Sequence, residues 1–376
     1  MCEFRSFVSA NTEEFDVFGN GRNPFFASDN MSCSHEMVIA SVCEMVCGNT
    51  VGFEKNFVDY VFGHFDFASD NVIKDNLFIF EAKIDTDDGD MLSININVTE
   101  NGENKKMFGW HVKGNDPEYI RFLKNMIPEL VKVLKEENVI ENTYFHLSDE
   151  PTEEHINEYA EAYNIIKPLI GDCKIFEPCS SMIFKKNNVM DIPIVATDRI
   201  MPFIEEKITP MFAYYCGMQH YKLSNRYISM PLYRCRIIGI QCYKYDMKGF
   251  LFWGFNFYNS ACSEYVINPF LTTSADRKFV SGNSFIVYPG KSEPYPSLRY
   301  MMMRDAMQDI RLLKQVEKHI GKEAVVKIID EEANMNITFA EYPRNKDYQI
   351  DLNNKLKKII AEKEDSKKGK KEKNLW

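Results

Sequence analysis

Two adjacent carboxylates, Asp149 and Glu150, have the residue types and spacing best suited to chemistry in this sequence. They lie in the run Ser148-Asp-Glu-Pro151, directly after a short aromatic segment and directly before a helical pattern. Two carboxylates at a cleft can divide glycoside cleavage between them, one protonating the leaving oxygen and the other managing positive charge at the anomeric carbon. Consecutive positions also suit substrate-assisted hydrolysis, in which the sugar's own acetamido oxygen is the nucleophile.

The position of this pair, rather than the dipeptide itself, sets it apart. Other acidic dipeptides occur in the chain, among them Glu13-Glu14, Glu136-Glu137, Glu205-Glu206 and Asp330-Glu331. A solvated loop or a helix cap is therefore the competing interpretation. The carboxyl ends of strands in α/β barrels carry catalytic groups, which favours the functional interpretation. Pro151 also favours an extended backbone at Glu150, which would turn the two side chains toward different parts of one substrate.

A helix, a strand and a second helix are expected to position the pair. Asp116-Pro117 can cap a helix whose apolar residues recur every three or four positions as far as Leu134, although Pro128 should kink it. Residues 143–148 are aromatic and bounded by polar residues, which is typical of a strand. A helix from about residue 152 to Pro168 follows, with acidic residues in its first turn.

The same alternation of strands and helices continues along the chain. Strands are predicted at 173–177, 191–197, 210–216, 249–255 and 284–288. Helical segments are predicted near 202, within 226–245, and from 298 to a stop at Gly321. This alternation implies an α/β fold with a mainly parallel sheet, and we predict a (β/α)8-like TIM barrel.

The two ends of the chain read differently from this middle part, 101–345, which we take as the catalytic domain. Residues 1–100 contain no clear strand-helix unit and are interpreted as a partial or divergent barrel start. Within them, residues 91–99 alternate like an exposed strand and lead to a turn at 100–103. Residues 346–376 form a charged tail, expected to be helical or disordered.

Composition narrows the class of partner. The formal net charge of -10 argues against nucleic acid, because binding phosphates requires a basic face. No run of apolar residues is long enough for membrane insertion, and the start of the chain lacks a signal-peptide pattern, so we expect a cytoplasmic protein. The ten cysteines contain no CxxC pair and are expected to be reduced.

Several common catalytic motifs are absent from the sequence. It has no GxxxxGK[ST] phosphate loop, no strand-GxGxxG-helix unit, no HExxH and no GxSxG. The seven histidines are not grouped at the spacing of metal ligands. We therefore expect carboxylate chemistry with no cofactor and no metal.

The segment from Tyr144 to Pro151, Tyr-Phe-His-Leu-Ser-Asp-Glu-Pro, resembles the catalytic motif of glycoside hydrolase family 123, the β-N-acetylgalactosaminidase family. Further segments are similar to the same catalytic domain, at residues 224–227, 243–258, 285–290, 297–299 and 307–311. The similarity extends from about residue 105 to 345. Members of the family usually carry upstream barrel strands that residues 1–95 match poorly, and a barrel without them has an open edge.

The resemblance implies roles for the two carboxylates. Asp149 would orient the substrate's acetamido group and stabilise an oxazolinium-like intermediate, while Glu150 would be the general acid and then the base. The enzyme would remove terminal β-linked N-acetylhexosamine with retention of configuration, N-acetylgalactosamine being favoured. Its partner would be a glycan or glycoconjugate.

Other side chains near predicted strand ends are candidates for binding the sugar. The candidates are Trp253, Asn256, Tyr214, Tyr215 and Asp198. An aromatic face can stack on a sugar and an amide can bond its hydroxyls, but core packing or a turn is the competing interpretation for each. Arg226 would bind a substrate group or form a structural ion pair, and His146 is expected to be a core residue. Trp110 and His111 lie where they could reach the cleft.

Two alternatives stay open. One is a glycosidase-like protein that binds carbohydrate without hydrolysing it. The other is a hydrolase that uses the same carboxylates on a different sugar. The substrate-assisted mechanism excludes sugars without the acetamido group, so substrate choice separates them. The oligomeric state is not predicted.

Overall fold

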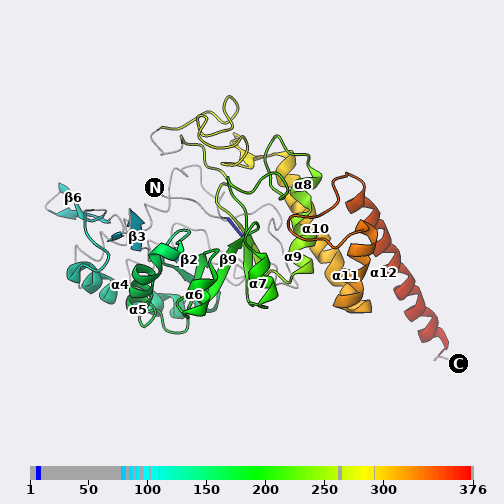
Figure 1. Cartoon of the computed structure of the whole chain (residues 1–376), viewed down its shortest axis with the longest axis horizontal. Coiled ribbons are helices and arrows are strands. Elements are labelled where there is room, and N and C mark those ends of the chain that lie inside the picture. The colour runs from blue at the N-terminus through cyan, green and yellow to red at the C-terminus, as the bar shows by residue number, and fades with distance from the viewer. Residues whose placement is uncertain are drawn as a thin grey trace.

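The fold is that of a computed structural model, which describes residues 6–9, 78–81, 84–87, 90–93, 96–100, 103–109, 111–260, 265–291 and 293–373. At its centre is a seven-stranded sheet with the order β1-β11-β10-β9-β8-β7-β2 (Figure 1). Its strands are β1 (Ser6–Ser9), β2 (Phe78–Glu81), β7 (Thr143–His146), β8 (Lys174–Pro178), β9 (Ile192–Ala196), β10 (Phe212–Tyr214) and β11 (Gly249–Phe252). Neighbours from β2 to β11 are parallel, and β1 is antiparallel to β11.

This sheet confirms the predicted α/β class. The five strands from β7 to β11 form a curled, parallel half-barrel. Among the described strands, no pairing joins β2 to β1, so they do not show a closed barrel. The predicted strands at 173–177, 191–197, 210–216 and 249–255 correspond to β8, β9, β10 and β11.

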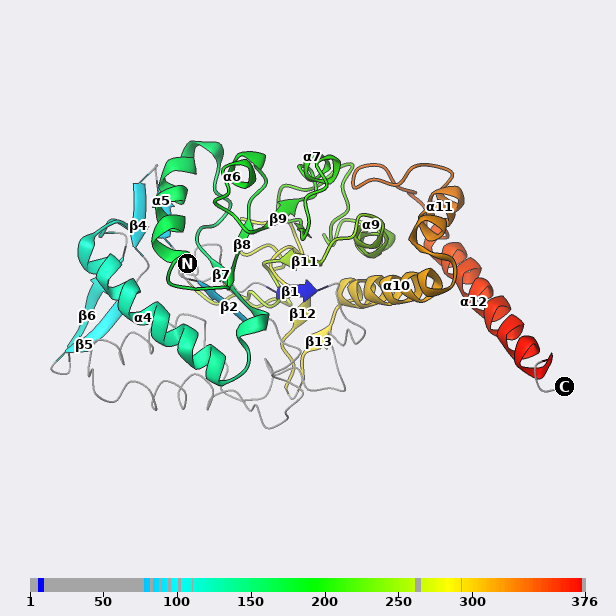
Figure 2. The same cartoon turned by 90° about the horizontal axis from the view of Figure 1, so that it is seen from below.

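Helices alternate with these strands and cover the outer face of the sheet. The helices before β11 are α4 (Pro117–Glu136), α5 (Ile156–Ile166), α6 (Met182–Lys186), α7 (Met201–Glu205), α8 (Tyr233–Arg236) and α9 (Ile238–Lys244). Short 3-10 helices lie at η3 (Ile140–Asn142) and η4 (Glu153–His155). Figure 2 shows α5, α6, α7 and α9 following one another along the same side as the strands progress.

Three further helices form the C-terminal part of the molecule: α10 (Leu298–Ile320), α11 (Lys322–Ala333) and α12 (Tyr348–Lys373). Gly321, with a φ of 83°, ends α10 where the sequence predicted a stop. The predicted charged tail is helical as far as Lys373, and its first turns bury Leu352 and Leu356 in the core. Figures 1 and 2 show the rest of α12 extending away from the body. None of the helices in the described part combines the length and apolar character that crossing a bilayer requires.

Both faces of the central strands are buried, as expected for a parallel sheet. On β9 and β10, Val195 and Ala213 pack with the helices, whereas Ile194, Phe212 and Tyr214 belong to a cluster on the opposite, inner face. Successive strand residues point to opposite faces, so this alternation decides which side chains can reach the inner face.

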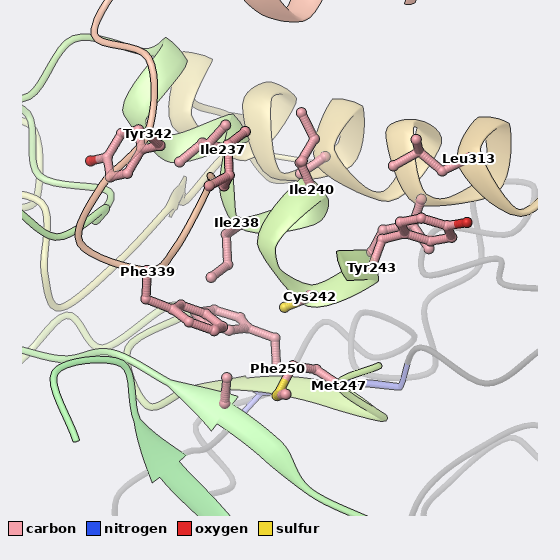
Figure 3. Packing of buried hydrophobic residues seen from close by; sticks show 14 of the residues in the cluster. Ile237, Ile238, Ile240, Cys242, Tyr243, Met247, Phe250, Leu313, Phe339 and Tyr342 are labelled. Atoms are coloured by element: carbon pink, nitrogen blue, oxygen red, sulfur yellow. The ribbon is translucent and has the colours of Figure 1, made fainter. Parts of the chain in front are cut away.

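The largest cluster lies between the sheet and the C-terminal helices. Figure 3 shows Ile240 of α9 pointing toward α10, whereas Ile238 points toward Phe339 and the strand that carries Phe250. Helices α9 and α10 approach closely, because a Cβ at Gly239 would lie 2.3 Å from the carbonyl oxygen of Ala306. The contact between Gly239 and the backbone of Ala306 therefore determines how closely the two helices pack.

Helix α4 includes Pro128 within a single helix, and the apolar face on either side of this residue is buried in one core. Two local predictions need correction. The predicted strand at 91–99 is two strands, β4 (Asp90–Ser93), which pairs with β3 (Ile84–Asp87), and β5 (Ile96–Glu100), which pairs with β6 (Glu103–Phe108). The predicted strand at 284–288 is only β12 (Val287–Tyr288), which pairs with β13 (Tyr295–Pro296) outside the main sheet.

Candidate active site

Asp149 and Glu150 lie in the loop between β7 and the turn η4 that leads into α5, as predicted. Asp149 is half-buried and Glu150 is exposed. The predicted extended backbone at Glu150 is wrong, because its φ is 46°, in the left-handed region. Such a conformation is uncommon for a residue with a Cβ, and it occurs often at functional sites where the surroundings hold it.

The end of β7 is held by Glu177 of β8, a residue that the sequence analysis missed. Glu177 has no exposed surface, and its Oε2 accepts a hydrogen bond from the backbone N–H of Leu147 at 3.0 Å. A buried side chain therefore bonds the backbone at the point where the chain leaves β7. A single acidic residue inside the apolar run Ile175-Phe-Glu-Pro178 was the signal that could have revealed it.

Tyr214 of β10 reaches the candidate acid directly. Its hydroxyl lies within hydrogen-bonding reach of the Glu150 and Ser180 side chains, and both influence its pKa. Burial raises the pKa of Tyr214 far above its usual value, and the negative charge of Glu150 adds to the shift. The phenol therefore stays protonated and remains a donor to Glu150.

Asp198, after β9, approaches the same place. Its Oδ1 accepts a hydrogen bond from Gln219 Nε2 at 2.8 Å, and Gln219 Oε1 accepts one from the backbone N–H of Cys216 at 2.7 Å. Burial raises the pKa of the Cys216 thiol to about 11, with further contributions from the charges of Glu150 and Asp198. Residues after β7, β9 and β10 thus converge at one edge of the sheet.

Trp253 and Asn256 follow the end of β11, and both are half-buried. The Trp253 ring packs edge-on against Phe257 and Phe279, with centroids 5.4 and 5.1 Å apart. Asn256 forms an isolated antiparallel bridge with Phe285. An aromatic cluster therefore holds the indole at the strand end and leaves part of it accessible.

The structure places Tyr215 in the core, which corrects its assignment as a sugar-binding candidate. It is completely buried, stacks edge-on against Phe250 at 4.6 Å, and its hydroxyl approaches Met303 Sδ at 3.6 Å. The physical reason is the strand alternation, because Tyr214 faces inward and its neighbour must then face the helices.

The other residues singled out in the sequence are His146, Arg226, His111 and Trp110. His146 is buried beside Glu177, which agrees with its interpretation as a core residue. Arg226 is buried and has no carboxylate partner in the described part of the chain; its guanidinium instead lies 3.3 Å from the ring centroid of Phe252. The predicted ion pair is therefore replaced by a cation–π contact. His111 is exposed, and Trp110 lies outside the described residues.

With this geometry established, comparison with known families decides the assignment. The model of the glycoside hydrolase 123 catalytic domain matches residues 49–316 of the 376 in the chain. The chain belongs to glycoside hydrolase family 123. The match confirms the resemblance, and it begins inside the segment in which the sequence showed no clear strand-helix unit.

A solved structure of another family 123 glycoside hydrolase, from Clostridium perfringens, has the same type of fold. That enzyme was described in a study of glycolipid glycan hydrolysis. The TM-score is 0.51 at 14% sequence identity, and the alignment covers 74% of this chain and 51% of the other. This family 123 chain therefore spans about half the length of that enzyme. No functionally curated protein matches it.

Among the residues of this family 123 chain that the structure describes, no group of three or more His, Cys, Asp or Glu residues could hold a metal ion. The groups available at the edge of the sheet are carboxylates, a phenol, an amide and an indole.

Proposed function

We propose that this chain is a retaining glycosidase that removes terminal β-linked N-acetylhexosamine, with N-acetylgalactosamine favoured, by using the substrate's 2-acetamido group as the nucleophile. The observation that carries the proposal is the consecutive pair Asp149 and Glu150 at the carboxyl end of β7. Asp149 is half-buried, whereas Glu150 is exposed and lies within hydrogen-bonding reach of Tyr214. Neighbouring carboxylates in different surroundings can take different roles.

In the proposed reaction, the half-buried Asp149 accepts a hydrogen bond from the acetamido N–H and holds the group under the anomeric carbon. The acetamido oxygen attacks that carbon as the bond to the leaving oxygen breaks, and Glu150 donates a proton to the leaving oxygen. An oxazolinium intermediate results, whose positive charge Asp149 stabilises. Glu150 then takes a proton from water as the water opens the ring, and two inversions retain the configuration.

The surrounding side chains would bind the sugar. Trp253 offers an aromatic face for stacking, and Asn256 and Asp198 offer polar groups for the hydroxyls. Their placement after β11 and β9, on the edge that carries the carboxylates, supports this assignment. We also propose that the half-barrel belongs to a (β/α)8-type barrel, which the parallel strand order and the likeness to the solved family member support.

The decisive experiment is turnover of the 4-nitrophenyl β-glycosides of N-acetylgalactosamine, N-acetylglucosamine and galactose. We expect turnover of acetamido sugars alone, and a loss on the order of a hundredfold or more in Asp149→Asn and in Glu150→Gln. The loss in Glu150→Gln should be larger for a methyl glycoside than for the 4-nitrophenyl one, because the poorer leaving group depends on the acid. Glu136→Gln, in another acidic dipeptide, is the matched control.

Each other outcome has a definite meaning. A folded wild type that binds N-acetylgalactosamine without turnover would indicate a silent carbohydrate-binding relative. Turnover of the galactoside would indicate a hydrolase for a different sugar, because that substrate lacks the nucleophile. Inhibition by the N-acetylgalactosamine thiazoline, a stable mimic of the oxazolinium ring, would further support the substrate-assisted route.

A further inference from the structure

We propose that the five residues Glu177–Ser181, which we call the support segment, position both catalytic carboxylates, and that Glu177 is the principal positioning residue. The inference rests on the proposed function. The segment, Glu-Pro-Cys-Ser-Ser, ends β8 and continues beyond it, directly beside the loop that carries the carboxylates. Its members bond to the chain on both sides of the pair.

Glu177 is the strongest of these contacts. Its carboxylate has no exposed surface and has four donors around it. Nδ1 of His146 lies 2.7 Å from Oε1, and the N–H of Ser148 donates to the same oxygen at 3.2 Å. The N–H of Leu147 and the hydroxyl of Tyr159 both donate to Oε2 at 3.0 Å. Hydrogen bonds to a charged acceptor are about twice as strong as neutral ones.

These hydrogen bonds begin where the backbone pairing of β7 with β8 ends. The ladder between β7 and β8 consists of Tyr144 with Lys174 and Phe145 with Ile175. Immediately beyond it, the side chain of Glu177 accepts hydrogen bonds from the consecutive backbone N–H groups of Leu147 and Ser148. The two peptide groups that precede Asp149 are therefore fixed by one buried carboxylate, and the loop departs from the sheet at a defined point.

The support segment also holds the far side of the pair. The thiol of Cys179 donates to the carbonyl oxygen of Pro151 at 3.8 Å, and the hydroxyl of Ser181 donates to Glu153 Oε1 at 2.9 Å. Every second residue of the segment thus contacts the loop. Because both ends of the loop are held, the left-handed backbone of Glu150 can be maintained against its intrinsic cost.

Ser180, between these residues, acts on the Glu150 side chain instead. Its Oγ accepts a hydrogen bond from the N–H of Ala196 at 2.9 Å. The hydroxyl of Tyr214 lies within hydrogen-bonding reach of both Ser180 and Glu150. One segment therefore fixes the backbone of the pair directly and the acid's carboxyl through one tyrosine. Positioning is catalytic in effect, because a misplacement of about 1 Å can cost roughly a hundredfold in rate.

The test compares Glu177→Gln with Tyr159→Phe in the full chain. Both variants lose a hydrogen bond of the same buried carboxylate, but only Glu177 is bonded to the loop of the pair. For Glu177→Gln we expect kcat on the acetamido substrate to fall about 10- to 100-fold with KM within about threefold. Its inhibition constant for the thiazoline should rise in parallel, since intermediate binding depends on the same geometry. Tyr159→Phe should lower the melting temperature and leave kcat unchanged.

Equal kcat values for wild type and a folded Glu177→Gln would overturn the inference, as would parallel losses in the two variants. If Glu177→Gln does not fold, Ser180→Ala provides the second test through the Tyr214 contact. An unchanged kcat in that variant would then reject the inference. A wild type that is silent on every acetamido glycoside would instead reject the proposed function, and the inference with it, so the two failures are distinguished.

Discussion

The hydroxyl of Tyr214, on β10, lies within hydrogen-bonding reach of the side chain of Glu150, in the loop after β7. One partner is a buried phenol and the other is an exposed acid. Because burial keeps the phenol protonated, the acid faces a permanent donor on the inner side and solvent or substrate on the other.

Removing that donor should cost activity rather than stability. In Tyr214→Phe we expect kcat/KM on the acetamido glycoside to fall about 10- to 100-fold, because a hydrogen bond to a charged group contributes about 1.5–3 kcal/mol. Steady-state kinetics on the 4-nitrophenyl substrate measure this. Tyr258→Phe, which loses a bond to the carbonyl oxygen of Val287 at 2.9 Å, is the control and should keep wild-type kinetics. Equal losses in both variants would argue against a specific role for Tyr214.

The close contact between α9 and α10 should tolerate no side chain at position 239. In Gly239→Ala the new Cβ would lie 2.3 Å from the Ala306 carbonyl oxygen, so the helices must separate. We expect the free energy of unfolding to fall by about 2–3 kcal/mol, measured by urea denaturation. Gly171→Ala is the control, because it has nothing within 4 Å and its φ of 58° costs only about 1 kcal/mol. A smaller loss at 239 than at 171 would contradict the prediction.

A buried ion pair joins α8 to α10. The Nε and Nη2 atoms of Arg236 each lie 2.6 Å from an oxygen of Asp309, which is 1% exposed and also accepts a bond from Asn353 of α12. In Arg236→Met we expect a loss of about 3–5 kcal/mol of stability at pH 8, because the carboxylate stays buried without its cation. Arg121→Met, in the exposed pair with Glu118, should cost under about 0.5 kcal/mol.

The pH dependence of that loss is a second measure of the same pair. Burial raises the pKa of Asp309 above its usual range, although Arg236 opposes the shift. A raised folded-state pKa means that stability falls as pH rises through it, and removing the arginine strengthens the effect. The penalty of Arg236→Met should therefore be smaller at pH 5 than at pH 8. A pH-independent penalty would contradict this account.

Buried thiols should destabilise the protein in alkali. Burial raises the pKa of Cys179, Cys235 and Cys242 to about 12 from the usual 9.0. Between these values the unfolded chain loses thiol protons that the folded chain keeps, so the free energy of unfolding falls as pH rises, by roughly 1 kcal/mol per thiol and pH unit. The contribution is fully present below pH 9.0. Urea unfolding from pH 8 to 10 under reducing conditions should show this slope, and Cys242→Ala should make it shallower.

Local pattern was enough to predict the strands and helices that build the site. The apolar segments at β8, β9, β10 and β11 and the acidic pair after β7 were all identified from the sequence, because strand character depends on neighbouring residues. The family resemblance was confirmed as well. The proposed roles of Asp149 and Glu150, and the expected cytoplasmic location, stay predictions.

What the sequence did not reveal depended on contacts between distant residues. The direction in which Tyr214 and Tyr215 point was settled by the register of β10 against its neighbours, which a list of aromatic residues does not contain. The positive φ of Glu150 was not predicted from Pro151 beside it, and neither was the buried Glu177, on the next strand, that bonds the backbone just before the loop. Local preference alone decided neither feature.

Helix α12 is a suitable place to attach a label to the molecule. Its first turns are locked to α10 through Asn353 and the buried leucines, while Figures 1 and 2 show its last turns leading away from the sheet. A fluorophore or a surface tether attached to these last turns would be carried on a helix that extends away from the rest of the molecule.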